Sequence, residues 1–168
     1  MAVPNPQEFF DQANKLIAPH EGMKPTQVDL RRAVSAAYYG LFHATVAAAA
    51  DQFVGRTNPL TGQYALAYRS VQHGRLRDKC KANSCVPTKY ESYVPARNFG
   101  QDIQRFAFGV VQLQQKRHTH DYDPLTTATL SDATEAVKLA RASLEAFDAA
   151  EPGQRELFLG WLLFEPCG

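Results

Sequence analysis

The sequence predicts an all-α protein: an up-and-down antiparallel bundle of about five helices with a short C-terminal helix. Apolar residues recur at helical spacing in successive segments, short connections separate these segments, and no segment alternates apolar and polar residues as a β-strand does. The chain has 168 residues, 45% hydrophobic and 21% charged, which suits one domain with a substantial core. We therefore assign residues 1–168 to a single domain, with its core at 26–150 and an apolar C-terminal segment at 151–168.

The N-terminal half of the chain contains the longest predicted helix. A short first helix is predicted over residues 6–17, where the apolar residues form one stripe. The long helix is predicted over residues 26–54, because no proline interrupts this stretch. Its length would be roughly 43 Å. Thr26 and Asp29 form a capping box at its start, and Gly55 is suited to end it.

The middle of the chain has a less regular pattern. A third helix is predicted over residues 62–73, followed by the basic segment RLRDKCKANS at 75–84, for which the helical prediction is weaker. Residues 84–95 contain two prolines and two tyrosines and are expected to form an irregular loop. From residue 69 to 97 there are seven Lys or Arg against two acidic residues. Such a segment can steer an anionic partner, contribute to a self-complementary dimer or form an ordinary solvated face.

The C-terminal half contains two further long helices and a short apolar segment. Helices are predicted over residues 98–120 and 126–150, separated by a break before Pro124. The segment ELFLGWLLF within residues 155–164 is apolar almost all round. A segment of this composition is buried, either in its own domain or against a partner chain.

The apolar runs, the N-terminus and the cysteine count of the chain indicate its compartment. No uninterrupted apolar run reaches the roughly 18 residues that span a membrane, and the N-terminus does not resemble a signal peptide. Three cysteines, an odd number, do not suggest a disulfide framework. We therefore expect a cytoplasmic protein with no membrane association and no cofactor.

The long predicted helix has two different faces. One arc is small and apolar, so another helix can approach it closely. The adjacent arc is polar and aromatic, and contains Arg31, Arg32, Ser35, Tyr38, Tyr39, Phe42 and His43. Two interpretations of this arc remain open. It is either a half-buried face whose polar ends reach water, or one wall of a groove that binds nucleotides.

The densest group of reactive side chains lies at the end of the helix predicted over 98–120. It contains Arg117, His118, His120, Asp121, Tyr122 and Asp123. Arg117, His120 and Asp121 share a helix face, so a histidine acid/base could act beside a cation that holds phosphate, as a metal-independent ribonuclease requires. The alternatives are an ordinary helix C-terminus with dipole-compensating side chains, and a metal site of His118, His120, Asp121 and Asp123. The spacing fits no familiar zinc-hydrolase motif, so no metal site is predicted.

Two motifs give the chain a family resemblance. RRAVSAAYYGLFHA at 31–44, followed by RHTHDYDP at 117–124, resembles the HEPN superfamily (higher eukaryotes and prokaryotes nucleotide-binding), and most of all its small bacterial branch. The resemblance covers residues 26–150. It implies an up-and-down helical bundle that often forms homodimers and binds RNA or nucleotides. Many such proteins are toxin ribonucleases, and several are encoded beside a nucleotidyltransferase partner.

The resemblance can be carried over residue by residue, with one departure. Arg117 matches the motif arginine, but the ribonuclease pattern has four to six residues between this arginine and a histidine, and the corresponding positions here hold Tyr122, Asp123 and Pro124. His120 is therefore the candidate acid/base beside Arg117. The implied RNA- or nucleotide-binding residues are Arg31, Arg32, Tyr38, Tyr39, His43, Asp121, Tyr122 and Asp123.

Two functional hypotheses follow from this resemblance. The first is an RNA- or nucleotide-binding protein, with metal-independent endoribonuclease activity in a toxin–antitoxin or defence system. The second is a non-catalytic interaction module that dimerises and pairs with a nucleotidyltransferase-type partner. The dimer is expected both from the family and from the apolar C-terminal segment.

Overall fold

The computed structural model describes residues 3–20, 22–55, 61–94 and 96–165. Within these ranges the chain forms seven α-helices and one short 3-10 helix, and no β-strand is among its elements. The prediction of an all-α protein is confirmed. The number of helices exceeds the predicted five plus a C-terminal helix, because a helix also forms in the basic middle segment.

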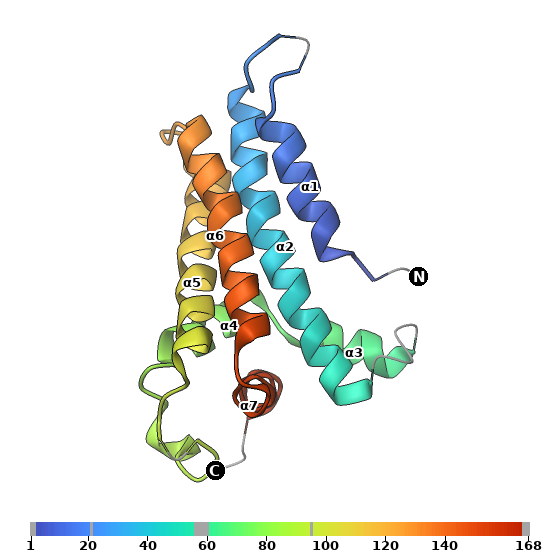
Figure 1. Cartoon of the computed structure of the whole chain (residues 1–168), viewed down its shortest axis with the longest axis vertical. Coiled ribbons are helices and arrows are strands. Elements are labelled where there is room, and N and C mark those ends of the chain that lie inside the picture. The colour runs from blue at the N-terminus through green and yellow to red at the C-terminus, as the bar shows by residue number, and fades with distance from the viewer. Residues whose placement is uncertain (1–2, 21, 56–60, 95, 166–168) are drawn as a thin grey trace.

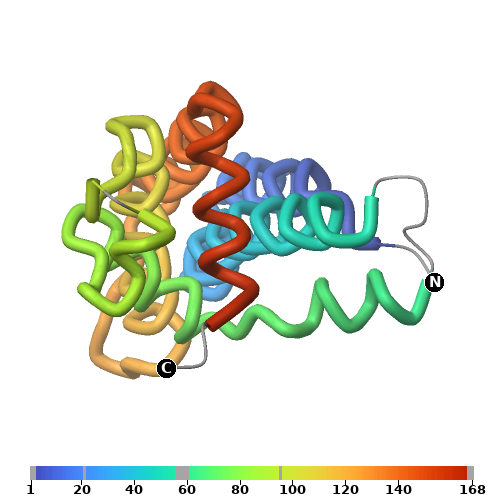
Figure 2. Tube along the Cα trace, turned by 90° about the horizontal axis from the view of Figure 1, so that it is seen from below, coloured from blue at the N-terminus to red at the C-terminus, as the bar shows by residue number. Residues whose placement is uncertain are grey.

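Four long helices lie side by side along the length of the molecule (Figure 1). They are α1 (Pro6–Ile17), α2 (Gln27–Val54), α5 (Gln101–Tyr122) and α6 (Leu130–Ala149). The α1–α2 and α5–α6 connections lie at the same end of the molecule, at the top of Figure 1. At the other end lie α3 (Gly62–Ser70), α4 (His73–Ala82), the 3-10 helix η1 (Thr88–Tyr90) and α7 (Pro152–Leu163), which crosses below α2 (Figure 2).

Helix α2 is the centre of this packing. Thr26 and Asp29 form the predicted capping box, and Gly55 ends the helix with a φ of 89°. Helices α1, α3, α5, α6 and α7 all contact α2. By length and mean hydropathy α2 could also cross a membrane, although it contains no uninterrupted apolar run of that length. In this fold 67% of the most apolar 18-residue stretch of α2 is buried. The apolar side chains of α2 therefore pack against the neighbouring helices.

The middle of the chain is more ordered than the sequence suggested. The helix predicted over 62–73 is two helices, because buried Val71 has an extended backbone between α3 and α4. The basic segment is the regular helix α4, which buries Leu76, Lys79 and Cys80. Residues 84–94 include η1 and bury Val86, Tyr90 and Val94 against the core. This segment therefore closes the lower end of the molecule.

The apolar C-terminal segment packs within its own chain. Phe158, Leu159, Trp161 and Leu162 of α7 are at most 6% exposed. Phe158 meets the rings of Phe99 and Phe106 edge-on, with centroids 5.5 and 5.7 Å away. Of the two predicted locations for this segment, the structure shows the first, burial in the domain itself.

Candidate functional site

The two motifs that carry the family resemblance contact each other. The Arg31 guanidinium donates hydrogen bonds to the backbone carbonyls of His120 (3.0 Å), Asp123 (3.2 Å) and Thr126. One turn earlier, the Gln27 side chain both donates to and accepts from the backbone of Ala128, at 2.7 and 2.9 Å. The start of α2 therefore fastens the end of α5 and the loop that follows it. Arg31, expected to bind RNA, uses its donors inside the fold.

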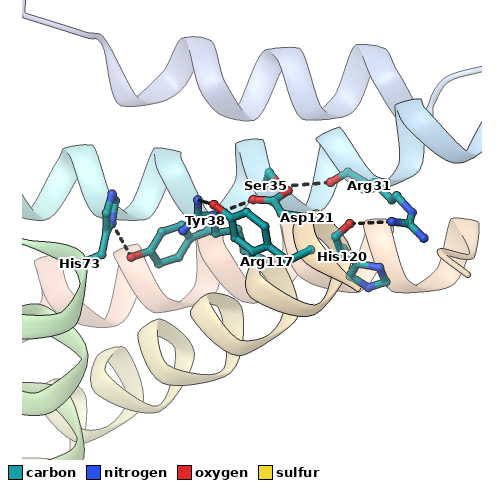
Figure 3. A network of polar contacts seen from close by, with 8 residues as sticks. Arg31, Ser35, Tyr38, His73, Arg117, His120 and Asp121 are labelled. Carbon is teal, nitrogen blue, oxygen red and sulfur yellow. Dashed lines mark hydrogen bonds and ion pairs between the residues drawn. The ribbon is translucent and has the colours of Figure 1, made fainter. Parts of the chain in front are cut away.

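Arg117 lies on α5 and faces α2. Its Nε donates to Asp121 Oδ2 at 2.8 Å, and the other oxygen of Asp121 accepts a hydrogen bond from Ser35 of α2 (Figure 3). The guanidinium carbon lies 5.2 Å from the ring centroid of Tyr39 and 5.9 Å from that of Tyr38. These contacts bring the aromatic arc of α2 and Arg117 together.

Tyr122 and Asp123 occupy different positions around Arg117. The Tyr122 ring centroid lies 5.8 Å from the Arg117 guanidinium carbon, and the side chain is 64% exposed. Asp123 accepts hydrogen bonds from the Leu125 amide and the Thr126 hydroxyl, and these bonds lower its pKa. Tyr122 therefore belongs to the Arg117 cluster, whereas Asp123 stabilises the loop after α5.

His73 belongs to this cluster although the sequence did not single it out. Its Nδ1 lies 2.8 Å from the hydroxyl of buried Tyr38, and its ring centroid lies 4.0 Å from that of Phe42. Burial, followed by the positive charge of Arg117, lowers the pKa of His73. Burial also raises the pKa of Tyr38, so this hydroxyl stays protonated at neutral pH. The pair Tyr38–His73 forms only when α4 packs against the bundle, and no local motif marks it.

Two other predicted binding residues lie outside the cluster. His43 Nδ1 is 2.6 Å from the Tyr68 hydroxyl, and its ring stacks on Phe9 at 4.8 Å. Its ring is next to Tyr39, so His43 is one aromatic ring removed from Arg117. Arg32 is exposed near the start of α2, where hydrogen bonds from Thr26, and to a lesser extent the charge of Arg32, lower the pKa of Asp29.

His120 occupies a different environment from the one its proposed catalytic role requires. It is 7% exposed, and its buried Nδ1 has no hydrogen-bond partner among the described residues. Its pKa is lowered chiefly by burial, so the ring is neutral at pH 7. In Figure 3 the Arg117 side chain extends toward Tyr38, whereas the His120 ring lies away from it. A general acid/base must reach the proton that it transfers, and this placement does not support that role for His120.

One buried and two half-buried histidines predict a loss of stability in mild acid. His43, His73 and His120 all have pKa values lowered by burial, so the folded state binds fewer protons than the unfolded chain. Above pH 6.5, the ordinary histidine pKa, the neutral histidines make their full contribution to the free energy of unfolding. This contribution is lost as the pH falls from 6.5 toward the lowered pKa values of the folded state. We expect urea unfolding to give a lower free energy at pH 5.5 than at pH 7.5.

The variant His120→Leu separates this effect from general acid sensitivity. It removes one titrating ring and an unpaired buried nitrogen, so its stability should fall less between the two pH values. The carboxylates of Asp123 and Asp132 have lowered pKa values and therefore titrate below the range from pH 5.5 to 7.5. An identical fall in wild type and His120→Leu would show that His120 does not contribute.

A polar hollow of about 370 Å³ lies between α4 and α5, next to the Arg117 cluster. The ring centroids of His118 and Tyr122 lie 5.1 Å apart at the end of α5. In the described parts of the chain, no group of three or more His, Cys, Asp or Glu is placed to hold a metal ion. The side chains lining the hollow are Arg77, Lys81, Val111, Gln112, Gln114, Gln115, Arg117 and His118.

Comparison with known proteins found no matching family model, curated protein or solved structure. The functional proposal therefore depends on the Arg117 cluster and the adjoining hollow. Arg117 is the residue that these two features share.

Proposed function

We propose that this chain is an RNA- or nucleotide-binding protein of the HEPN type, in which Arg117 holds a phosphate group. The observation that carries this proposal is the fixed position of Arg117. Asp121 binds its Nε, tyrosine rings flank it, and the side chain also lines a polar hollow. A guanidinium offers five donors in a rigid plane, which suits phosphate. Arg117 uses Nε for Asp121 and one terminal nitrogen for the Tyr122 hydroxyl at 3.5 Å, so other terminal N–H groups are left for a ligand.

The neighbours of Arg117 suit the other parts of a nucleotide. Asp121, itself bonded to Ser35, fixes the orientation of the guanidinium before a ligand arrives. The exposed Tyr122 ring offers a face on which a base can stack. Three glutamines in the hollow supply amide donors and acceptors.

Binding without cleavage is the form of this function that we favour. Metal-independent RNA cleavage requires a group that takes the proton of the attacking hydroxyl, and His120 is buried. A protein of this kind in a toxin–antitoxin or defence system would act by capturing RNA or a nucleotide.

A second candidate is the interaction module that dimerises and pairs with a nucleotidyltransferase-type partner. The exposed rings of Phe53 and Phe164 lie 5.5 Å apart, and Phe164 borders an apolar hollow of about 360 Å³ that Tyr93 and Trp161 also line. Exposed apolar side chains beside a hollow favour contact with another protein. Light scattering showing a monomer at micromolar concentration would count against the dimer.

The test of the first candidate measures binding and cleavage of RNA in the presence of EDTA. We expect salt-sensitive RNA binding without cleavage, weakened about 10- to 100-fold by Arg117→Ala because charge-assisted hydrogen bonds are lost. Arg105→Ala is the matched control, since Arg105 is an exposed arginine on the same helix and lines a different hollow. Cleavage by the wild type that Arg117→Ala abolishes would establish the ribonuclease instead. Equal binding by wild type and Arg117→Ala would contradict the assignment of Arg117.

A further inference from the structure

Helix α4 presents two cations to the hollow that contains Arg117. Arg77 and Lys81 are four residues apart, so they share one face of α4, while Leu76, Lys79 and Cys80 are buried. Lys81 is exposed, and 43% of the Arg77 side chain is exposed. The hollow therefore has cations on both of the helices that form it.

The charge of the hollow is positive. The side chains that line it in the described residues include Arg77, Lys81 and Arg117 and no carboxylate. Two carboxylates lie near it: Asp78 binds Arg77 Nε at 2.8 Å, and Asp121 binds Arg117 Nε at 2.8 Å. Each uses one side of a guanidinium, so both arginines keep terminal donors for an anion.

The ends of the hollow differ in chemistry. Cations lie along α4, whereas His118, which lines the hollow, lies at the end of α5 with its ring tilted against that of neighbouring Tyr122. Tyr122 is 64% exposed, which leaves its ring available to a base. A groove of cations beside aromatic rings is the arrangement that binds single-stranded nucleic acid, with the phosphates on the cations and the bases on the rings.

We propose that the ligand of this site is single-stranded RNA, whose consecutive phosphates bind Arg77 and Lys81 of α4 and Arg117 of α5. This inference rests on the proposed function and extends it from one phosphate-binding arginine to a strand-binding wall. Because the cations are divided between two helices, they suit the successive phosphates of a strand better than a single phosphate group. A duplex would hide its bases from Tyr122, and a nucleoside monophosphate would leave part of the wall without a phosphate.

The experiment is a salt titration of RNA binding followed by fluorescence anisotropy. The probe is a fluorescein-labelled oligouridylate, and the variant is Arg77→Gln/Lys81→Gln. For single strands the slope of log K against log salt is about −0.7 per neutralised phosphate, so three contacts give a slope of about −2. The double variant should reduce it to about −0.7, with a large loss of affinity at low salt. The Arg77 and Lys81 side chains are solvent-accessible, so the variant should remain folded.

The control removes the same charge elsewhere. Arg105→Gln/Lys138→Gln neutralises two exposed cations on α5 and α6 that do not line the hollow, and its slope should equal that of the wild type. Duplex RNA and ATP, added as competitors, should displace the probe more weakly than unlabelled oligouridylate.

The outcomes separate this inference from the function on which it rests. If Arg117→Ala weakens binding while Arg77→Gln/Lys81→Gln keeps the wild-type slope, the role of α4 is wrong and the proposed function stands. Displacement by ATP or duplex RNA as strong as by oligouridylate would overturn the preference for a single strand. Failure of the wild type to bind any of these ligands would overturn both.

Discussion

Replacing Arg31 with alanine is expected to lower the free energy of unfolding by about 3 kcal/mol, and the melting temperature by about 6–12 °C. The variant loses three hydrogen bonds from a charged donor to the carbonyls of His120, Asp123 and Thr126. These carbonyls lie in the last turn of α5 and in the segment after it, where intrahelical donors run out. Thermal unfolding followed by circular dichroism measures the effect.

Arg32→Ala provides the matched control for Arg31→Ala. It removes the same side chain from the next position of α2, but Arg32 is exposed, and its charge is the smallest of the causes that act on the pKa of Asp29. Its effect should stay within about 0.5 kcal/mol. If the two variants were equally stable, Arg31 would be free to bind RNA as the family resemblance implies. The assignment of Arg31 to stabilising the end of α5 and the loop after it would then be wrong.

The parts of the fold that could be predicted are those determined locally. Thr26, Asp29 and Gly55 mark the ends of α2 because capping depends on residues within one turn. Helix α4 was only weakly indicated because half of its residues are charged, and buried Leu76 and Cys80 supply too short an apolar pattern. Packing on α5 and α7 stabilises it, and a sequence pattern does not show such contacts.

The candidate site illustrates the same limit. Arg117, Tyr38 and Tyr39 were identified from motifs and do meet. His120 and Asp121 follow Arg117 by three and four residues, so they lie on opposite sides of it, about 100° apart around the helix. Asp121 faces Ser35 on α2, and His120 consequently turns into the core. Helical spacing places both residues within about one turn of Arg117, but which of them faces α2 depends on how α5 is rotated against α2.

Trp161→Ala is expected to be among the most destabilising single changes, at about 3–5 kcal/mol. The Trp161 ring is stacked on Phe99 with centroids 5.6 Å apart and meets Tyr90 edge-on at 5.7 Å. Lys79 Nζ lies 4.6 Å from its centroid, so the variant also removes a partner of a buried cation. Urea unfolding measures the loss. Phe164→Ala is the control, because Phe164 is 54% exposed and should cost less than about 1 kcal/mol.

Trp161→Ala should also weaken RNA binding, although Trp161 is not in the hollow. Lys79 lies on α4 between Arg77 and Lys81, and its contacts with Trp161 and Tyr90 hold α4 in place. If α4 positions two of the three phosphate contacts, loosening it should reduce the salt dependence of binding under conditions where the variant remains folded. A folded Trp161→Ala protein with the wild-type salt slope would show that α4 keeps its position without this anchor.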